Sequence, residues 1–330
     1  MRKALFLLLL ALMASGLVLL SPNQPLAADS ALVFKAVAFL PPNNANVAGF
    51  DIFANKINNK FKDKVKIQIV GGPEVIPPFQ LHEAVKSGAI DMCLTSCGYY
   101  PSVVWEAQAA MFSNKSFQEI AQTEFFDIMS KLHKDAGLVW LGAGTIDDVF
   151  YIYTNPVIKS PQDFSGKRIR IFPPFIPLIN ALKAVPINLP MGDIYTAMER
   201  GAVDGFVQSP LGFVTDFSWH EVTKYLIKYP LYQATAVVLA NPKSWGKISP
   251  DLQKEIMEFK KKEIDPAVSL FYRNLGAERL KLMMDKGVKP LEFSPQDGGA
   301  FLKVAYDSAW DQVSAKSPEL GPKLKKMLVK

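Results

Sequence analysis

One stretch of the sequence, residues 163–210, constrains the fold more strongly than any other part of the chain. Short segments rich in β-branched residues alternate there with segments of helical spacing. They predict strands at 167–172, 187–189 and from 203 onwards, with helices at 175–184 and 193–200. Strands and helices that alternate in this way are typical of a largely parallel sheet. The sequence therefore predicts an α/β fold.

A similar alternation nearer the amino terminus predicts a second α/β half. Its expected elements are strands at 32–39, 65–70 and 90–95 and helices at 46–61, 79–87 and 117–136. Strands at 138–143, 149–154 and 235–239 are expected to connect the halves. A long helix is expected from Pro250 to about residue 286, with Pro266 as a kink or break, before a final helix at 294–317.

Arg170 stands near the carboxyl end of the strand at 167–172. The alternation of side chains along a strand places Arg168 and Arg170 on one face and the two neighbouring isoleucines on the other. Ligands of such sheets bind outside the carboxyl ends of the strands, and an arginine can hold a carboxylate with two parallel hydrogen bonds. A surface arginine paired with a nearby acid is the plainer alternative.

Several segments resemble the signature of the solute-binding proteins of TRAP transporters, of the DctP type. They are residues 165–171, 191–198 and 201–205, with 65–69 and 83–92 upstream. The resemblance extends over nearly all of the chain after residue 28. It implies a two-lobed periplasmic-binding-protein fold (type II-like), with lobes joined by crossing strands and a long C-terminal helix spanning both. It also implies extracytoplasmic capture of a small organic acid, with Arg170 holding the ligand carboxylate.

The resemblance implies, position by position, a set of ligand-binding residues. Besides Arg170 they are Gln208, Ser209, Ser96, Tyr99, Phe39 and Met191. Gln208 and Ser209 fall where the family often has an asparagine, and one extra residue here leaves open which of the two takes its place. Tyr151, Tyr153 and Trp219 are expected to pack in the core instead.

Phe150 departs from the family pattern. Many members carry a second arginine about twenty residues before the first, aimed at the ligand, and Phe150 stands at that position here. No positive charge in the segment replaces it. The departure favours a monocarboxylate with an apolar or aromatic body over a short dicarboxylate, with Phe150 itself against the ligand.

The amino-terminal 28 residues read as a secretory signal peptide. Arg2 and Lys3 precede an apolar run from residue 4 to 20, and cleavage is expected after Ala28. An uncleaved membrane anchor is the alternative, because the run approaches the length of a membrane span. We therefore expect an exported, periplasmic protein.

The charge and the histidines exclude several function classes. The formal net charge is +6 at pH 7, and removal of the two basic residues of the signal peptide lowers it to +4, a mild bias that suits an anionic ligand but not a nucleic acid. His82, His133 and His220 stand apart, without metal-ligand spacing. Without a phosphate loop or a serine elbow, the sequence predicts no enzyme, no cofactor and no metal.

Cys93 and Cys97 are the only cysteines. An oxidising compartment permits a disulfide between them, but so short a loop strains the geometry. Two small buried thiols are the alternative. The spacing leaves both states open.

The expected division of the chain is residues 1–28 as signal peptide, 29–150 and 151–239 as first and second lobe, and 240–330 as helices packed over both. Part of the last segment should complete the first lobe. The expected partners are the small organic acid and the integral membrane subunits of a TRAP transporter, with the receptor itself a monomer. The alternatives are a periplasmic binding protein of an ABC permease or a sensor, or a secreted α/β enzyme.

Overall fold

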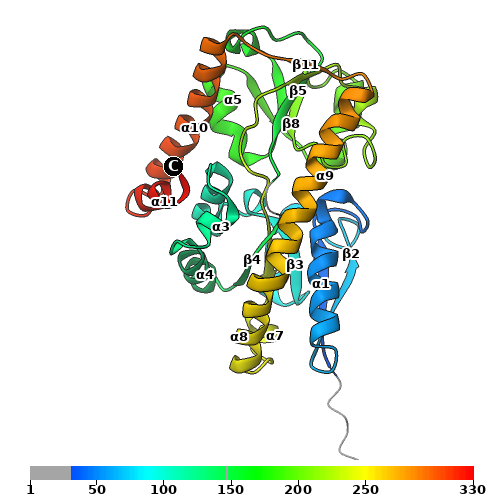
Figure 1. The fold of residues 1–330 in the computed structure, drawn as a ribbon, viewed down its shortest axis with the longest axis vertical. Helices are drawn as coiled ribbons and strands as arrows, with labels where there is room; N and C mark the ends of the chain where they lie inside the picture. Colours follow the sequence, from blue (N-terminus) through cyan, green and yellow to red (C-terminus); the bar gives the residue numbers. More distant parts are fainter. Residues whose placement is uncertain (1–30, 146–147) are drawn as a thin grey trace, which may run out of the picture.

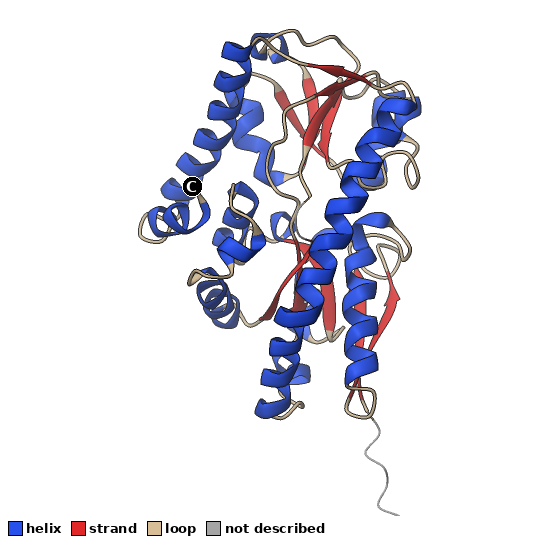
Figure 2. Cartoon of the chain, viewed as in Figure 1, coloured by secondary structure: helices blue, strands red, loops and turns tan. Residues whose placement is uncertain are grey.

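Two β-sheets form the centres of two lobes in the computed structural model of the protein, which describes residues 31–145 and 148–330 (Figure 1, Figure 2). The predicted signal peptide lies outside the described residues. Helices cover the sheets, and the mixed α/β architecture predicted from the sequence is confirmed. Within the described part of the chain, no helix combines the length and the apolar character needed to cross a bilayer.

The first lobe contains a five-stranded sheet in the order β2-β1-β3-β10-β4. Its strands are β1 (Leu32–Ala38), β2 (Val65–Gly71), β3 (Met92–Ser96), β4 (Val139–Thr145) and β10 (Ala236–Ala240). β1 pairs in parallel with β2 and β3, whereas β10 runs antiparallel to both of its neighbours. The α-helices of this part are α1 (Ala48–Lys60), α2 (Leu81–Ser87), α3 (Phe117–Ile120), α4 (Phe125–Asp135), α7 (Pro242–Trp245) and α8 (Pro250–Phe259).

The second lobe contains a six-stranded sheet in the order β11-β9-β5-β8-β6-β7. Its strands are β5 (Tyr151–Thr154), β6 (Arg168–Ile171), β7 (Val185–Asn188), β8 (Gly205–Gln208), β9 (Tyr225–Ile227) and β11 (Lys289–Leu291). Its helices in the predicted alternation are α5 (Ile176–Ala181) and α6 (Ile194–Glu199). β6 pairs in parallel with both β7 and β8, so the stretch that the sequence singled out folds as the predicted parallel unit.

Three segments connect the two lobes. The chain passes from β4 to β5 and returns from β9 to β10, and a bridge between Val149 and Gln233 ties these two crossing segments together. The third connection is α9 (Asp265–Asp285), which runs from the first lobe to the second in Figure 1. A single π-helical turn, Lys260–Ile264, joins it to α8. The long helix expected from Pro250 to about residue 286 is therefore confirmed, with the irregular turn just before Pro266.

The carboxyl-terminal helices also contact both lobes. α10 (Pro295–Lys316) packs on α5 in the second lobe and on a 3-10 helix, Trp105–Phe112, that belongs to the first. The indole N–H of Trp310 donates to the Phe112 carbonyl oxygen at 3.2 Å. α11 (Gly321–Leu328) then folds back against the same 3-10 helix.

The predicted helix at 117–136 is wrong in one respect, because α3 and α4 are two separate helices. Thr123 lies at the break. Its hydroxyl donates to the Ile120 carbonyl oxygen at 2.7 Å and accepts from the Phe125 N–H at 3.3 Å. A threonine side chain that bonds nearby backbone groups offers them an alternative to the helical ladder, and the helix ends there. β11 and α11 were not predicted from the sequence.

Lys260 and Asp265 form a buried ion pair at the π-helical turn. Their side chains are 4% and 6% exposed, and Lys260 Nζ lies 2.5 Å from Asp265 Oδ1. Gly142 of β4 leaves room for the amine, because a Cβ there would lie 3.0 Å from Nζ. Burial raises the pKa of the Asp265 carboxyl, and the Lys260 charge opposes that rise. The pair fixes the junction between α8 and α9 against β4.

We expect the Asp265→Asn substitution to lower the free energy of unfolding by about 3–5 kcal/mol, because it leaves a buried ammonium group without its counter-charge. The control is Asp285→Asn, which removes the exposed partner of Lys281 on the same helix and should change stability by less than about 0.5 kcal/mol. Urea unfolding of both variants measures the difference. Equal small effects would show that the pair does not hold the junction.

Candidate functional site

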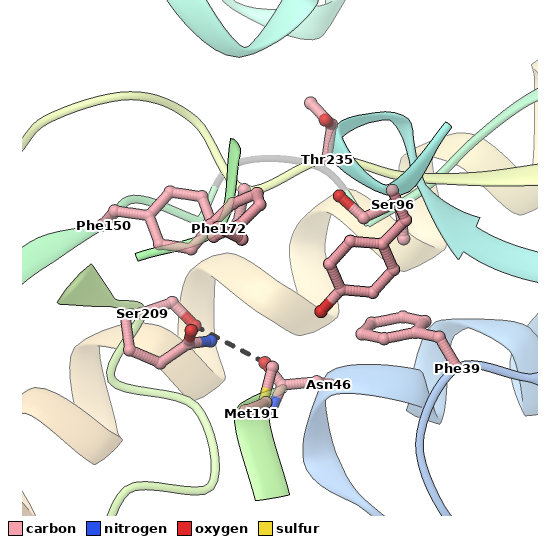
Figure 3. A pocket seen from close by; sticks show the side chains of 12 residues that line it. Phe39, Asn46, Ser96, Phe150, Phe172, Met191, Ser209 and Thr235 are labelled. Atoms are coloured by element: carbon pink, nitrogen blue, oxygen red, sulfur yellow. Dashed lines mark hydrogen bonds between the residues drawn. The ribbon is translucent and has the colours of Figure 1, made fainter. Parts of the chain in front are cut away.

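A small cavity lies between the two lobes, beside the carboxyl ends of strands from both sheets (Figure 3). Its volume is about 40 Å³. Its lining residues are Phe39, Asn46, Ser96, Tyr99, Phe150, Phe172, Met191, Gln208, Ser209, Ala234, Thr235 and Ala236. They lie at the carboxyl ends of β3 and β8, in the segments that follow β1, β3, β6, β7 and β8, or at and just before the starts of β5 and β10. The position agrees with the rule that ligands of α/β sheets bind outside the carboxyl ends of the strands.

Seven of the eight residues proposed from the sequence line this one cavity. Arg170 is the exception, because it does not line the cavity. Its Nη1 lies 3.5 Å from Oε1 of Gln208, and Gln208 is one of the lining residues. Sequence reasoning missed the other five lining residues, Asn46, Phe172, Ala234, Thr235 and Ala236. Phe172 closes the predicted strand around Arg170, and that position could have suggested it. Asn46 and Thr235 carry no motif, and only the folded chain brings them here.

Arg170 is a buried cation without an ion-pair partner among the described residues. It is 1% exposed, and its guanidinium donates to backbone oxygens instead. Nε and Nη2 donate to the Leu189 carbonyl oxygen at 2.9 and 2.7 Å, and Nη1 donates to that of Val207 at 3.2 Å. Burial lowers the pKa of the guanidinium to about 10, so it is still charged at neutral pH. A buried charge of this kind is stabilised by an anion.

The guanidinium retains donors for such an anion. Of its five N–H groups, those bonded to Leu189 and Val207 are fixed by the backbone. The remaining Nη1 hydrogen is directed to Gln208 Oε1 at the long distance of 3.5 Å, and the second Nη2 hydrogen has no hydrogen-bond partner in the described chain. Nη1 and Nη2 can therefore hold the two oxygens of one carboxylate, with the Gln208 side chain beside them.

Aromatic rings form the walls of the cavity. On the second lobe, Phe150 packs against Phe172 with ring centres 5.4 Å apart. On the first lobe, Phe39 meets Tyr99 at 5.9 Å, and Tyr99 in turn meets Phe172 across the cleft at 6.1 Å. Burial raises the pKa of the Tyr99 phenol, although the charge of Arg170 opposes this. The walls thus offer apolar surface to a ligand, and the phenol of Tyr99 and the guanidinium of Arg170 lie nearby.

Direct hydrogen bonds hold the two lobes together at the edge of the cavity. The Ala45 N–H donates to Asp216 Oδ2 at 2.7 Å, and Asn46 Nδ2 donates to the Leu211 carbonyl oxygen at 3.2 Å. Ser209 Oγ donates to Asn46 Oδ1 at 3.5 Å, as the dashed line in Figure 3 marks. These contacts join the loop after β1 to the loop after β8. We call them the interlobe contacts.

The other aromatic residues and the two cysteines that the sequence singled out are buried. Tyr151, Tyr153 and Trp219 are buried, as expected for core residues. Cys93 and Cys97 are both free thiols, and Cys97 Sγ lies 3.0 Å from Thr235 Oγ1. No group of three or more potential ligands within the described residues could hold a metal ion.

These features define a two-lobed binding protein with its candidate ligand site between the lobes. The sequence matches the model of the bacterial extracellular solute-binding proteins, family 7 (DctP), over residues 36–317. The chain belongs to this family. The resemblance that the sequence showed is thereby confirmed.

Individual relatives are distant in sequence. A solute-binding protein of Roseobacter denitrificans is 26% identical over 159 residues, 48% of this chain and 47% of that protein. The chain thus matches only about half the length of that relative. A monocarboxylate 2-oxoacid-binding periplasmic protein of Nostoc sp. is 23% identical over 281 residues, 81% of this chain and 75% of that protein.

Solved structures are similar in fold. A TRAP periplasmic solute-binding protein of Desulfovibrio salexigens, with bound orotic acid, has a TM-score of 0.81 at 20% identity, covering 90% of this chain and 97% of that one. An extracytoplasmic solute receptor of Bordetella pertussis that binds pyroglutamic acid has a TM-score of 0.80 at 15% identity, covering 90% and 99%. The two-lobed fold predicted from the sequence is confirmed by this likeness.

We expect the Asp216→Ala substitution to weaken the interlobe contacts and shift the protein towards an open form. An exposed hydrogen bond of this type contributes about 0.5–1.5 kcal/mol, so ligand affinity should fall by about two-fold to ten-fold. The control is Glu292→Ala, which removes the partner of Lys228 within the second lobe. Small-angle scattering should show a larger radius of gyration for the first variant only. Identical scattering curves would contradict the assignment.

Proposed function

We propose that the protein is the extracytoplasmic receptor of a TRAP transporter and binds a small monocarboxylate between its lobes. As a monomer, it would deliver the ligand to the integral membrane subunits. The observation that carries the proposal is the buried guanidinium of Arg170, which has no carboxylate partner among the described residues and lies behind Gln208 at the cavity. Family membership supports the receptor role rather than an enzymatic one.

The ligand must enter through a more open form of the cleft. A cavity of about 40 Å³ holds only a few water molecules, which is less than the volume of an organic acid. Hinged lobes allow such opening, and closure around a ligand is a common motion of two-lobed receptors. The interlobe contacts would then re-form over the bound acid and keep water from the ion pair with Arg170.

The aromatic walls favour a ligand with one carboxylate and an apolar or aromatic body. Phe150 lies where many family members have a second arginine, and it packs on Phe172 and Phe175 at 5.4 and 5.1 Å. A second carboxylate placed there would lose its hydration without gaining a cation. Proteins of this fold with bound orotic acid or pyroglutamic acid show that the architecture accommodates compact ring acids.

We expect Arg170→Lys to lose about 2–5 kcal/mol of binding free energy, or about thirty-fold to several-thousand-fold in affinity. A lysine keeps the charge but lacks the planar pair of N–H donors that holds both carboxylate oxygens. Arg168→Lys is the matched control on the same strand, because Arg168 is exposed and pairs with Asp204 at 2.9 Å. Calorimetric titration with the acid found in the screen below measures both. Full affinity in Arg170→Lys would refute the role of Arg170.

A thermal-shift screen tests the ligand class. Ring monocarboxylates such as orotate and pyroglutamate, and 2-oxo monocarboxylates, should raise the melting temperature more than succinate or malate, because only a bound ligand stabilises the folded state by mass action. Phe150→Ala should weaken ring acids by about 0.5–1.5 kcal/mol more than pyruvate, through loss of the aromatic contact. Stabilisation by C4-dicarboxylates alone would leave the receptor role standing and overturn the monocarboxylate assignment.

A further inference from the structure

Asp148 is a buried carboxyl group that ligand binding as proposed above does not use. It lies in the first crossing segment, between β4 and β5, and is 3% exposed. Its backbone oxygen accepts from the Ala234 N–H of the second crossing segment at 2.8 Å. Its side chain contacts the hydroxyl of Ser209, a residue of the cavity wall, and the Val149 N–H. Its Oδ2 is buried and has no hydrogen-bond partner within the described part of the chain.

Among the described residues packed around Asp148, no cation lowers the pKa of its carboxyl group. On β5, Tyr151 and Tyr153 are close enough for the Asp148 charge to raise their own pKa values. On α9, a Cβ added at Gly276 would lie 3.2 Å from Oδ1. Two arginines lie one turn away on that helix, and neither is free: Arg279 pairs with Glu278, and Arg273 also has an interaction partner. From the loop after β8, the neutral Ser209 contacts the carboxyl group.

Ser209 lies between Asp148 and Asn46 of the first lobe, and its single hydroxyl hydrogen cannot be donated to both side chains. Ser209 Oγ donates to Asn46 Oδ1 at 3.5 Å. The Asn46 amide cannot be turned around without loss, because its Nδ2 donates to Asn44 Oδ1 at 3.1 Å and to the Leu211 oxygen at 3.2 Å. An ionised Asp148 accepts only, and would take the Ser209 hydrogen away from Asn46. A protonated Asp148 can donate to Ser209 Oγ and leave that hydrogen for Asn46.

We propose that Asp148 takes up a proton when the cleft closes, because the protonated carboxyl group completes the hydrogen-bond chain from Asp148 through Ser209 to Asn46 of the opposite lobe. Closure is therefore favoured by acidic solution. Burial supports this assignment, since it raises the pKa of Asp148 to about 7, while the bonds from Ser209 and Val149 offset only part of the effect.

The direction of the pH dependence follows from the two forms. We expect opening to admit water to Asp148, so that the pKa of its carboxyl group falls to the ordinary aspartate value of about 4. Below that pH both forms are protonated, and closure does not depend on pH. Between about pH 4 and pH 7, closure takes up as much as one proton and becomes up to about ten-fold less favourable per pH unit. Above that range both forms are ionised and the dependence levels off. Arg170 keeps its charge throughout.

The first test needs no ligand and is independent of the proposed function. Small-angle scattering of the wild-type protein should give a smaller radius of gyration at pH 5 than at pH 8. Asp148→Asn should be compact at both, because its amide N–H₂ donates to Ser209 at any pH. Asp127→Asn, an exposed acid on α4, is the control and should behave as wild type. A wild-type protein without a pH response, or the same response in Asp148→Asn, would overturn the proposal.

The second test uses orotate as the probe and rests on the proposed function. Calorimetric titration at pH 6 in two buffers of different ionisation enthalpy should show uptake of a substantial fraction of one proton on binding, and the affinity should fall by about ten-fold to a hundred-fold from pH 5 to pH 7.5. Asp148→Asn should lose both effects. Binding of orotate without proton uptake by the wild-type protein would refute the coupling even if the variant failed to fold. If orotate did not bind, the ligand assignment would fail and the scattering result would decide the coupling.

Discussion

A buried positive charge without an ion-pair partner in the described part of the chain is the constraint on which the candidate site depends. Arg170 comes from a strand whose alternate residues, Ile169 and Ile171, are fully buried, and it is itself drawn into the second lobe. The ends of β7 and β8 supply the backbone oxygens of Leu189 and Val207 that hold its guanidinium. The parallel β8-β6-β7 unit therefore positions the cation rigidly, and the cleft beside it is suited to an anion.

The end of β8 links this cation to the rest of the cleft. Gln208 approaches the Arg170 guanidinium, while the next residue, Ser209, contacts both Asp148 and the opposite lobe through Asn46. One short segment thus touches the anion-binding group, the crossing segments and the interlobe contacts. The long α8-α9 helix, whose junction contains the buried Lys260–Asp265 ion pair, runs from the first lobe to the second.

The periodic parts of the sequence were sufficient to predict the α/β elements, and the family resemblance supplied much of the candidate site. Residues 163–210 gave the parallel unit, and the family resemblance identified residues from both lobes, such as Tyr99 and Met191, that line one cavity. Asn46 and Asp148 could not be found in this way. The contact between Asn46 and Ser209 joins residues 163 positions apart, and it depends on side-chain geometry at the meeting of two lobes rather than on any local pattern.

The most direct test of this account is a crystal structure of the protein purified with the acid that it captures in its own host. The account predicts one ligand carboxylate on Nη1 and Nη2 of Arg170, with the Gln208 amide beside it and an apolar or aromatic body between Phe150 and Tyr99. A ligand bound elsewhere, or one whose carboxylate is held by other residues while Arg170 keeps only its backbone bonds, would contradict it.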